Sequence, residues 1–240
     1  MFTGIPAAST GVESAWCLSF DGVNDWVDIS GSLDSLLDGA ITLSCWAKLP
    51  THVGVLDIIL HFGSSSSRCV AMTAYTGGVS ATVAALGAIH RTSGNGNWAY
   101  GSAPSSVNVG DNNWHHLAIV SAGPNNAASI LLYVDGVSVT SAGNGSINTA
   151  GANRIGGVAG YSFAGQVDDV RIYNRALSPT EVTAIYTNTS PPTDVTAYLD
   201  LEEGTGTTTA VKDSTGSTIA TATLTNGPTW SNQVPPALAP

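Results

Sequence analysis

Residues 1–175 consist of short apolar runs that glycine, asparagine, aspartate and serine interrupt at close intervals. Runs of this length and composition, bounded by turn residues, predict β-strands, and Asp135-Gly136 between two of them predicts a tight hairpin. Many short strands at this spacing are typical of a β-sandwich or jelly roll. We therefore predict an all-β fold with strands in the runs Cys17–Phe20, Trp26–Ile29, Ile41–Leu49, Ile58–Phe62, Cys69–Thr73, Val79–Leu86, Asn113–Val120, Ile130–Val134 and Gly165–Tyr173.

A single helix signal follows these runs. Ser178 is a favourable N-cap, Pro179 suits the first helical position, and Glu181 stands at capping-box spacing from Ser178. Three apolar residues then recur at helical spacing, Val182, Ile185 and Tyr186. We predict one short helix over residues 178–187, which the Pro-Pro pair at 191–192 separates from the rest of the chain.

The chain carries few charges, and most of them are negative. Charged residues make up 10% of the sequence, and seven lysines and arginines against 17 acids give a formal net charge of −10. Binding to nucleic acid or to an anionic membrane requires a basic surface, so we expect neither partner. The 43% of apolar residues still provide for a packed core.

The sequence shows no targeting segment and no cysteine motif that would indicate a function. No segment approaches the roughly 20 apolar residues that span a bilayer. Residues 1–10 lack the charged and apolar regions of a signal peptide, so we expect a complete product made in a cytoplasm. Cys17, Cys45 and Cys69 show no CxxC spacing. We expect all three to be reduced and to lie in or near the core.

Five segments together resemble one fold family. They are, in chain order, Leu18–Val27, Ile41–Ala47, Trp114–Ala118, Leu132–Gly136 and Asp168–Ser178. In this order and spacing they resemble the laminin-G-like, concanavalin A-like jelly rolls, in particular the pentraxin-like branch, over residues 16–187. The resemblance implies a laminin-G-like β-sandwich that spans residues 1–190.

The segment 191–240 resembles a part of the same family that usually stands elsewhere. Ala197–Gly206, Asp213–Gly216 and Thr223–Trp230 are similar to the strand segment that normally precedes the opening motif. Either the domain is circularly permuted and this segment completes its own sandwich, or it completes a neighbouring subunit. We favour the first arrangement, and we do not expect a separate minidomain, because about 40 residues rarely hold a core alone.

We do not expect an enzyme. Glycosidases of related fold need two carboxylates that face one sugar, and the four glutamates form no such pair: Glu13, Glu181, Glu202 and Glu203. Glu181 fits helix capping, and Glu202-Glu203 fits a solvated turn. His115-His116 lie on a strand, so their rings point to opposite faces and cannot share a metal ion.

Calcium is the one cofactor that we expect. It prefers oxygen ligands, and Asp21 and Asp25 offer them in a turn. The family resemblance implies that this turn lies near the closing strand, where Asp168 matches a position that often ligates calcium. We therefore predict a site made by Asp21, Asp25 and Asp168; the alternative is that the first two only form the turn by accepting backbone hydrogen bonds.

A glycan site is expected among aromatic residues in polar loops. Trp98 and Tyr100 lie in a stretch rich in glycine, serine and asparagine, and Tyr161 lies in a second such cluster. We predict that these three residues bind the ligand. Three other tryptophans lie in strand patterns and are expected in the core: Trp26, Trp46 and Trp114.

These observations lead to three hypotheses for the function, since a fold does not fix one. The first is a non-catalytic structural or binding protein on the surface of a phage virion, a capsid decoration protein or a part of a receptor-binding fibre. Its partners would be capsid or fibre proteins or host surface glycans, and we expect a homo-oligomer. The alternative is a secreted or cell-surface carbohydrate-binding module, extracellular and lectin-like, and the third is a glycoside hydrolase.

Overall fold

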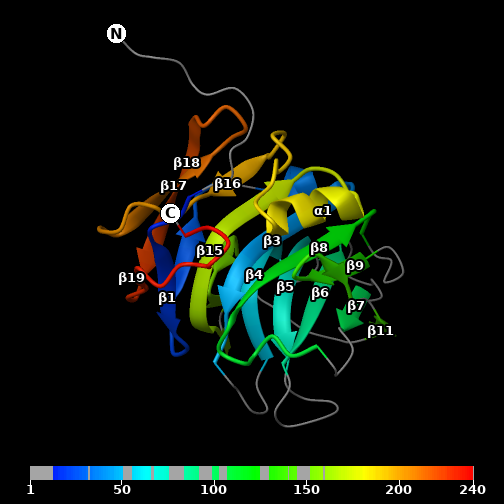
Figure 1. Cartoon of the computed structure of the whole chain (residues 1–240), viewed down its shortest axis with the longest axis horizontal. Coiled ribbons are helices and arrows are strands. Elements are labelled where there is room, and N and C mark those ends of the chain that lie inside the picture. Colours follow the sequence, from blue (N-terminus) through cyan, green and yellow to red (C-terminus); the bar gives the residue numbers. More distant parts are fainter. Residues whose placement is uncertain are drawn as a thin grey trace.

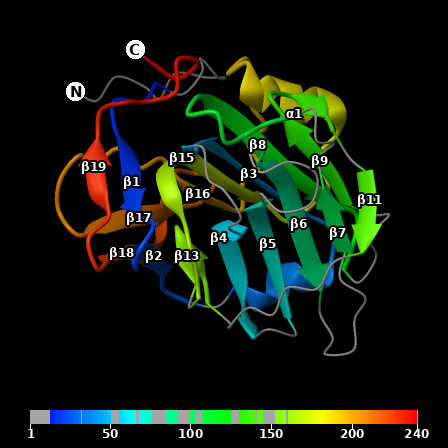
Figure 2. The ribbon, with the colours of Figure 1, turned by 90° about the horizontal axis from the view of Figure 1, so that it is seen from below.

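The computed structural model describes residues 13–31, 33–50, 56–65, 68–75, 84–91, 99–102, 107–124, 130–139, 141–144, 152–158 and 160–239. These residues form two stacked antiparallel layers of strands with one short α-helix (Figure 1 and Figure 2), which confirms the predicted β-sandwich. The predicted strand Val79–Leu86 is only partly described, and the strand there runs over Ala85–Arg91. In the described part of the chain, no helix is long and apolar enough to cross a membrane.

The first sheet contains the long strands of the family-like segments. Its order is β19–β1–β15–β3–β8–β9–β10. These strands are β19 (Thr229–Ser231), β1 (Cys17–Asp21), β15 (Ala164–Tyr173), β3 (Ile41–Lys48), β8 (Trp114–Ser121), β9 (Ile130–Val134) and β10 (Val137–Ser138).

The second sheet lies behind the first and has the order β17–β18–β2–β12–β4–β5–β6–β7–β11. Its strands are β17 (Thr208–Lys212), β18 (Thr218–Thr225), β2 (Trp26–Ile29), β12 (Arg154–Ile155), β4 (Leu56–Ser65), β5 (Arg68–Tyr75), β6 (Ala85–Arg91), β7 (Ala99–Ser102) and β11 (Ser141–Asn144). A 3-10 helix, Asp34–Asp38, and the small hairpin β13 (Gly157–Val158) and β14 (Tyr161–Ser162) accompany it.

The core lies between the two sheets. Alternate residues of each strand point inward, as in β3, where Leu43, Cys45 and Ala47 join the core cluster. Opposite them, β5 contributes Val70 and Met72. All three cysteines of the chain are reduced and buried, as predicted.

The segment 191–240 joins both sheets of the same chain. β16 (Ala197–Leu199) pairs with β15, β18 pairs with β2, and β19 pairs with β1. β16 also pairs with β17, so the chain passes from one layer to the other within this segment. Leu199, Leu201 and Val211 from this segment belong to the core cluster.

One face of the first sheet, which we call the outer face, points away from the core. The helix α1 (Pro179–Tyr186) lies across it, and residues 232–239, which we call the C-terminal strap, cross it nearby (Figure 2). Val182 and Ile185 of α1 pack there against Tyr133 and Tyr173. The helix begins with the predicted capping box, because Ser178 Oγ accepts from the Glu181 backbone and the Glu181 carboxylate accepts from Ser178 N.

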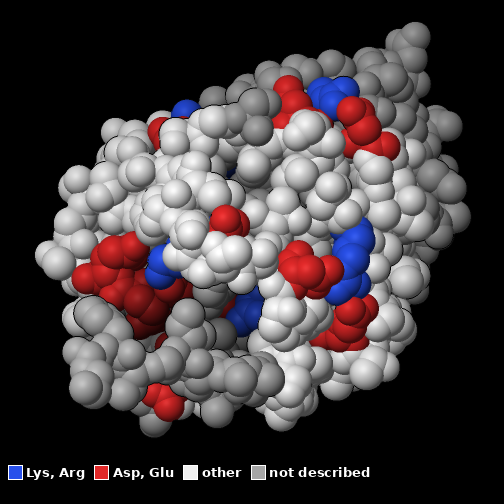
Figure 3. Space-filling view, turned by 90° about the horizontal axis from the view of Figure 1, so that it is seen from above, with Lys and Arg blue, Asp and Glu red and all other residues white. Residues whose placement is uncertain are grey.

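Most positive charges are paired with carboxylates. On the face shown in Figure 3, the described surface is largely uncharged, and the Lys and Arg side chains lie beside Asp and Glu. Among the side chains that the structure describes, five cations form ion pairs: Arg68 with Asp38, Arg154 with Asp28, Arg171 with Asp169, Arg175 with Asp194 and Lys212 with Asp200. The described part of the chain therefore presents no unpaired basic cluster.

Candidate functional site

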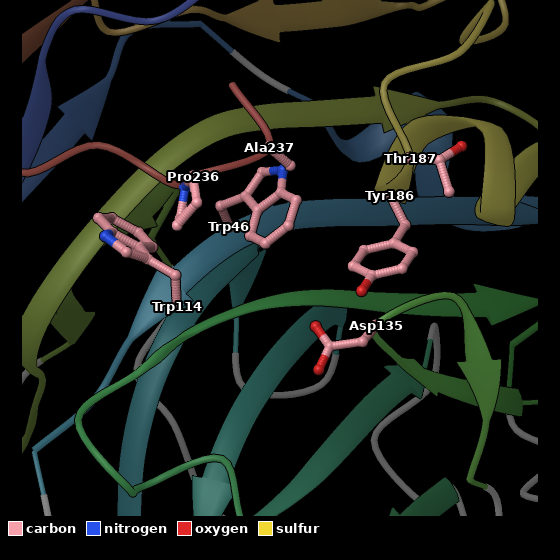
Figure 4. A pocket seen from close by; sticks show the side chains of 7 residues that line it. All are labelled: Trp46, Trp114, Asp135, Tyr186, Thr187, Pro236 and Ala237. Atoms are coloured by element: carbon pink, nitrogen blue, oxygen red, sulfur yellow. The ribbon is translucent and has the colours of Figure 1, made fainter. Parts of the chain in front are cut away.

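An aromatic pocket lies on the outer face of the first sheet. It has a volume of about 430 Å³ and lies between α1 and the C-terminal strap. Figure 4 shows Trp114 and Tyr186 at its two ends with Trp46 between them, and the carboxylate of Asp135 below Tyr186. Its remaining lining comes from Thr187, Pro236 and Ala237. We call this set the aromatic pocket.

Strand register explains why two tryptophans meet on this face. In β3 the residues next to Trp46, Cys45 and Ala47, point into the core, so Trp46 points outward. Trp46 pairs across the ladder with His116, and Lys48 pairs with Trp114. Trp46 is buried as expected, at 3% exposed, although it lies on the outer face of the sheet. The expectation of a core position was wrong for Trp26 and Trp114, which are half-buried.

The hairpin and the helix bring Asp135 and Tyr186 together. The predicted Asp135-Gly136 turn is present, and both residues have positive φ, 52° and 75°. A Cβ on Gly136 would lie 3.0 Å from Tyr186 Cδ1, so any larger residue would press on Tyr186 in addition to the strain of the positive φ. Tyr186 also packs 5.8 Å from the Trp46 ring, centroid to centroid.

The C-terminal strap forms the remaining wall. Trp114 Nε1 donates to Gln233 O over 2.9 Å, and Ser14 N donates to Leu238 O over 2.7 Å. Leu238 is 1% exposed, so the strap is anchored by a buried side chain as well as by hydrogen bonds. Pro236 and Ala237 are therefore held at the rim of the aromatic pocket.

Two adjacent histidines have opposite environments beside the pocket. His115 lies between carboxylates, with Nδ1 2.8 Å from Asp135 Oδ2 and Nε2 3.1 Å from Asp111 Oδ1, and the Asp135 hydrogen bond is the main cause that raises its pKa. His116 is fully buried next to Trp46, and desolvation lowers its pKa to about 3. Asp135 also accepts from His116 N, so its carboxylate is fixed by both residues.

We expect an NMR titration to separate these histidines. His115 should titrate above its ordinary pKa of 6.5, whereas His116 should stay neutral down to about pH 3. The folded state holds the His115 proton more tightly than the unfolded state does. The stabilisation that protonated His115 provides is therefore complete below pH 6.5 and is lost as the pH rises through the pKa of His115 in the folded state. Asp135→Asn should move the His115 pKa down towards 6.5; an unchanged value would contradict the role given to Asp135.

Several polar atoms near the pocket have no hydrogen-bond partner. Within the described residues, Trp46 Nε1, Ser44 Oγ and both ring nitrogens of His116 are buried and unsatisfied. Such atoms are rare in native proteins because each costs about 1–3 kcal/mol when it is left unpaired. Polar atoms without partners around an aromatic pocket favour a site that a hydroxylated molecule or water completes.

The predicted calcium ligands occupy two separate places. Asp21 Oδ1 accepts from Val23 N over 2.7 Å, and Asp25 Oδ2 accepts from Asp21 N over 3.1 Å, so both carboxylates shape the turn. Leu18 pairs with Val167, which places Asp168 near Cys17. Asp21 lies four residues further along β1, or about 13 Å at ~3.3 Å per residue, too far to share one ion with Asp168.

Asp168 instead lies in a group of oxygen atoms that connects three parts of the chain. Ser14 Oγ is 2.7 Å from Asp168 Oδ2, 2.7 Å from Glu202 Oε1 and 3.0 Å from Trp16 O. A single hydroxyl hydrogen cannot serve three acceptors at once. Glu202, expected in a solvated turn, is half-buried and also accepts from Ala15 N.

Asp168 and Glu202 do not form a glycosidase pair that a sugar could reach. Burial raises the pKa of Asp168 to about 8, but its side chain is fully buried and Ser14 Oγ lies between the two carboxylates. A catalytic acid must lie within hydrogen-bond reach of the substrate. No cluster of three or more His, Cys, Asp or Glu side chains suited to a metal ion occurs in the described part of the chain.

The predicted glycan residues are placed only in part. Trp98 lies outside the described residues, and Tyr100 is described only by its backbone in β7, next to β6. Tyr161 is half-buried and packs on Cys69, Ala71 and Ile89 of the second sheet. A glycan site at these residues stays a prediction. Tyr100 and Tyr161 lie with the second sheet, away from the aromatic pocket on the first.

Comparison with protein families gives one match. The model described as the concanavalin A-like lectin/glucanases superfamily, of laminin G type, matches residues 21–183. No curated protein matches the sequence.

Solved structures of similar fold come from bacteria, phages and animals. A candidate carbohydrate binding protein from Bacteroides ovatus is 15% identical, with a TM-score of 0.62, and the match covers 95% of this chain and 62% of that one. The enzymatically active domain of bacteriophage CBA120 tailspike protein 2 is 15% identical, with a TM-score of 0.52 and coverage of 83% and 35%. A heptameric pentraxin from Limulus polyphemus is 17% identical, with a TM-score of 0.48 and coverage of 79% and 87%. The chain thus spans less than two thirds of the Bacteroides and phage proteins.

Proposed function

The chain belongs to the concanavalin A-like lectin/glucanases superfamily, and from this premise we propose that it is a non-catalytic glycan-binding protein that uses the aromatic pocket. The observation that carries the proposal is the arrangement of Trp46, Trp114 and Tyr186 around the fixed carboxylate of Asp135. Aromatic faces pack on the C–H faces of a sugar ring, while a few well-placed polar groups orient it. Asp135 can accept from a sugar hydroxyl.

We further propose that the protein acts on the surface of a phage particle, as part of a receptor-binding fibre or as a capsid decoration protein. The fold that it shares with a phage tailspike domain supports this assignment, together with its low content of charged residues. A fibre part should bind bacterial surface polysaccharides. Selective binding to animal glycans would favour the alternative, a secreted or cell-surface lectin-like module.

Replacing Trp114 with alanine should weaken glycan binding about tenfold or more, which corresponds to a loss of about 1.4 kcal/mol. The reason is that Trp114 supplies one end of the aromatic pocket and anchors the C-terminal strap through its indole N–H. An array of bacterial polysaccharides and oligosaccharides identifies the ligand, and calorimetry on the best binder measures the affinity.

The matched control is Trp26→Ala. Trp26 is a half-buried tryptophan of β2 that packs under Arg154, on the second sheet and away from the aromatic pocket. Its replacement should leave the affinity unchanged. If Trp114→Ala binds like the wild type, or if no glycan on the array binds, the proposed site is wrong; loss of binding in both variants would point to a general effect on stability.

We also propose that calcium binds at Asp168 rather than at the Asp21–Asp25 turn. The oxygen atoms of Ser14, Trp16, Asp168 and Glu202 are the kind of donors that calcium prefers, and two carboxylates share one hydroxyl there. The ion would supply positive charge between the carboxylates and tie residues 14–16 to β15 and to residue 202.

Calcium in excess should raise the melting temperature by several degrees, because a ligand that binds only the folded state stabilises it by mass action. Thermal melts in calcium and in EDTA give the shift. Asp168→Asn should abolish it, whereas Asp21→Asn should retain it. The reverse pattern would place the ion at the turn, and no shift in the wild type would remove calcium from the proposal.

A further inference from the structure

A second pocket lies beside the α1–β16 connection and shares no lining residue with the aromatic pocket. It has a volume of about 450 Å³. β16, β17 and β18 lie together away from α1 (Figure 1). Residues of β16, of β17 and of the turn between β17 and β18 form much of the pocket wall. Its lining residues are Arg171, Pro191, Pro192, Thr193, Val195, Tyr198, Asp200, Lys212, Asp213, Ser214 and Gly216. We call this the polar pocket.

The walls of the polar pocket are held by local structure. Tyr198 pairs with Lys212 across β16 and β17, which sets the spacing of these two strands. The β17–β18 turn is fixed by Asp213 Oδ1, which accepts from Thr215 N over 2.8 Å and from Ser217 N over 3.1 Å. The pocket is therefore formed by a paired strand and a hydrogen-bonded turn.

Its charges are balanced inside the protein. Arg171 has a side chain only 6% exposed and is paired with Asp169, and its guanidinium lies 5.0 Å from the centre of the Tyr198 ring. Lys212 Nζ is paired with Asp200 Oδ2. Because each cation already has a carboxylate partner, neither an anion nor a cation would gain much net attraction here.

Two buried oxygen atoms in this pocket have no hydrogen-bond partner among the described residues, the Tyr198 hydroxyl and Asp200 Oδ1, and the carboxylate oxygen can only accept. Asp200 Oδ1 is buried and makes no hydrogen bond to the described residues, although Oδ2 of the same carboxylate is paired with Lys212. A buried carboxylate oxygen without a donor is costly, so native proteins supply one from the protein, from water or from a ligand. A neutral donor fits the balanced charges, and among neutral donors a hydroxyl group is the common one.

We propose that the polar pocket is a second binding site, which takes a neutral polyhydroxylated molecule, a sugar ring or a cyclitol, with one hydroxyl donating to Asp200 Oδ1. Pro191 and Pro192 offer apolar surface to the C–H faces of such a ring. The site is independent of the aromatic pocket in its residues. If both pockets bind glycans, each chain is bivalent and gains avidity on a repetitive polysaccharide.

The test is an NMR titration of the full chain with four neutral probes: myo-inositol, D-glucose, D-galactose and N-acetyl-D-glucosamine. At least one probe should shift the backbone amides of Lys212, Ser214 and Gly216 in a saturable way. Asp200→Asn should weaken that binding tenfold or more. Ser214→Phe, at an exposed lining position that leaves the Asp200–Lys212 pair intact, should abolish it by filling the pocket.

The control is Thr223→Phe, which adds the same ring at an exposed position of β18 that pairs with no residue of the pocket, and it should bind like the wild type. In the same titration, the signal of the Trp114 indole N–H shows whether a probe binds in the aromatic pocket. Binding at the two pockets is therefore tested independently. If none of the four probes shifts these amide signals, only water donates a hydrogen bond to Asp200 Oδ1, and the proposal is overturned. Shifts that survive both Asp200→Asn and Ser214→Phe would overturn it as well.

Discussion

Replacing Asp169 with alanine should lower the free energy of unfolding by about 3–5 kcal/mol, the usual cost of leaving one member of a buried ion pair without its partner. Asp169 is 1% exposed and Arg171 is 5% exposed. Arg171 Nε lies 2.9 Å and 3.1 Å from the two carboxylate oxygens of Asp169, and Nη2 lies 2.9 Å from one of them. Without the carboxylate, the guanidinium would stay charged and buried beneath the segment that follows α1.

The chain provides its own comparison in a second Arg–Asp pair. Arg175 and Asp194 have the same chemistry, with Nε 2.6 Å from Oδ2, but their side chains are 36% and 58% exposed. Asp194→Ala should therefore cost less than about 1 kcal/mol. Urea unfolding of both variants measures the difference, and equal losses would show that burial does not set the strength of the Asp169–Arg171 pair.

The φ of Asp169 requires one further variant. Its value of 50° lies in the left-handed region, where alanine adds about 1 kcal/mol of strain and asparagine is tolerated. Asp169→Asn should thus retain the backbone and lose the charge. If it is as stable as the wild type while Asp169→Ala is not, the effect comes from the backbone bulge at residues 168–171 and not from the ion pair.

The fold could be predicted because its signals are local. The Asp135-Gly136 turn needs two residues with positive φ, and the helix start needs only Ser178, Pro179 and Glu181. Each of these features depends on residues within a few positions of one another. The sequence therefore indicates them without knowledge of the three-dimensional arrangement.

The aromatic pocket could not be predicted in the same way, because it depends on which face of a strand is covered and by what. Seven successive residues of β3, Ile41 to Ala47, are buried, since the core covers one face and the helix and strap cover the other. The alternation that would have assigned Trp46 to the outer face is thus missing. One chemical signal remained: Ser44 and Lys48 are two residues from Trp46 on either side, so these polar residues point to the same face of the strand as Trp46.

The candidate calcium site shows a related limit. Asp168 was predicted as a ligand, but its neighbours Ser14 and Glu202 are 188 residues apart in the chain and meet only through the fold. Asp21 and Asp25, four residues apart, were easier to combine into one site. Proximity in sequence favoured Asp21 and Asp25, whereas the side chain that contacts Asp168 comes from Ser14.

Removing residues 191–240 should abolish cooperative folding, which is the largest effect that we expect. The truncated chain would lose the pairing of β16 with β15, of β18 with β2 and of β19 with β1. It would also lose Leu199, Leu201, Val211 and Leu224 from the core. At about 1.5–3 kcal/mol for each buried side chain, this loss is comparable with the whole stability of an ordinary domain, about 5–15 kcal/mol.

Thermal melts and light scattering of the full and truncated chains measure this effect and also test how the segment pairs. We expect the full chain to fold with its own segment and to form a homo-oligomer, with a mass that is a multiple of 24.3 kDa. The truncated chain should then lose its melting transition and aggregate, and an added peptide of residues 191–240 should restore the transition. A truncated chain that melts cooperatively as a monomer, while the full chain is an oligomer, would instead mean that the segment completes a neighbouring subunit. That outcome would leave the two-layer fold of residues 13–190 in place but would make the aromatic pocket, whose wall includes Pro236 and Ala237, a site shared between two chains.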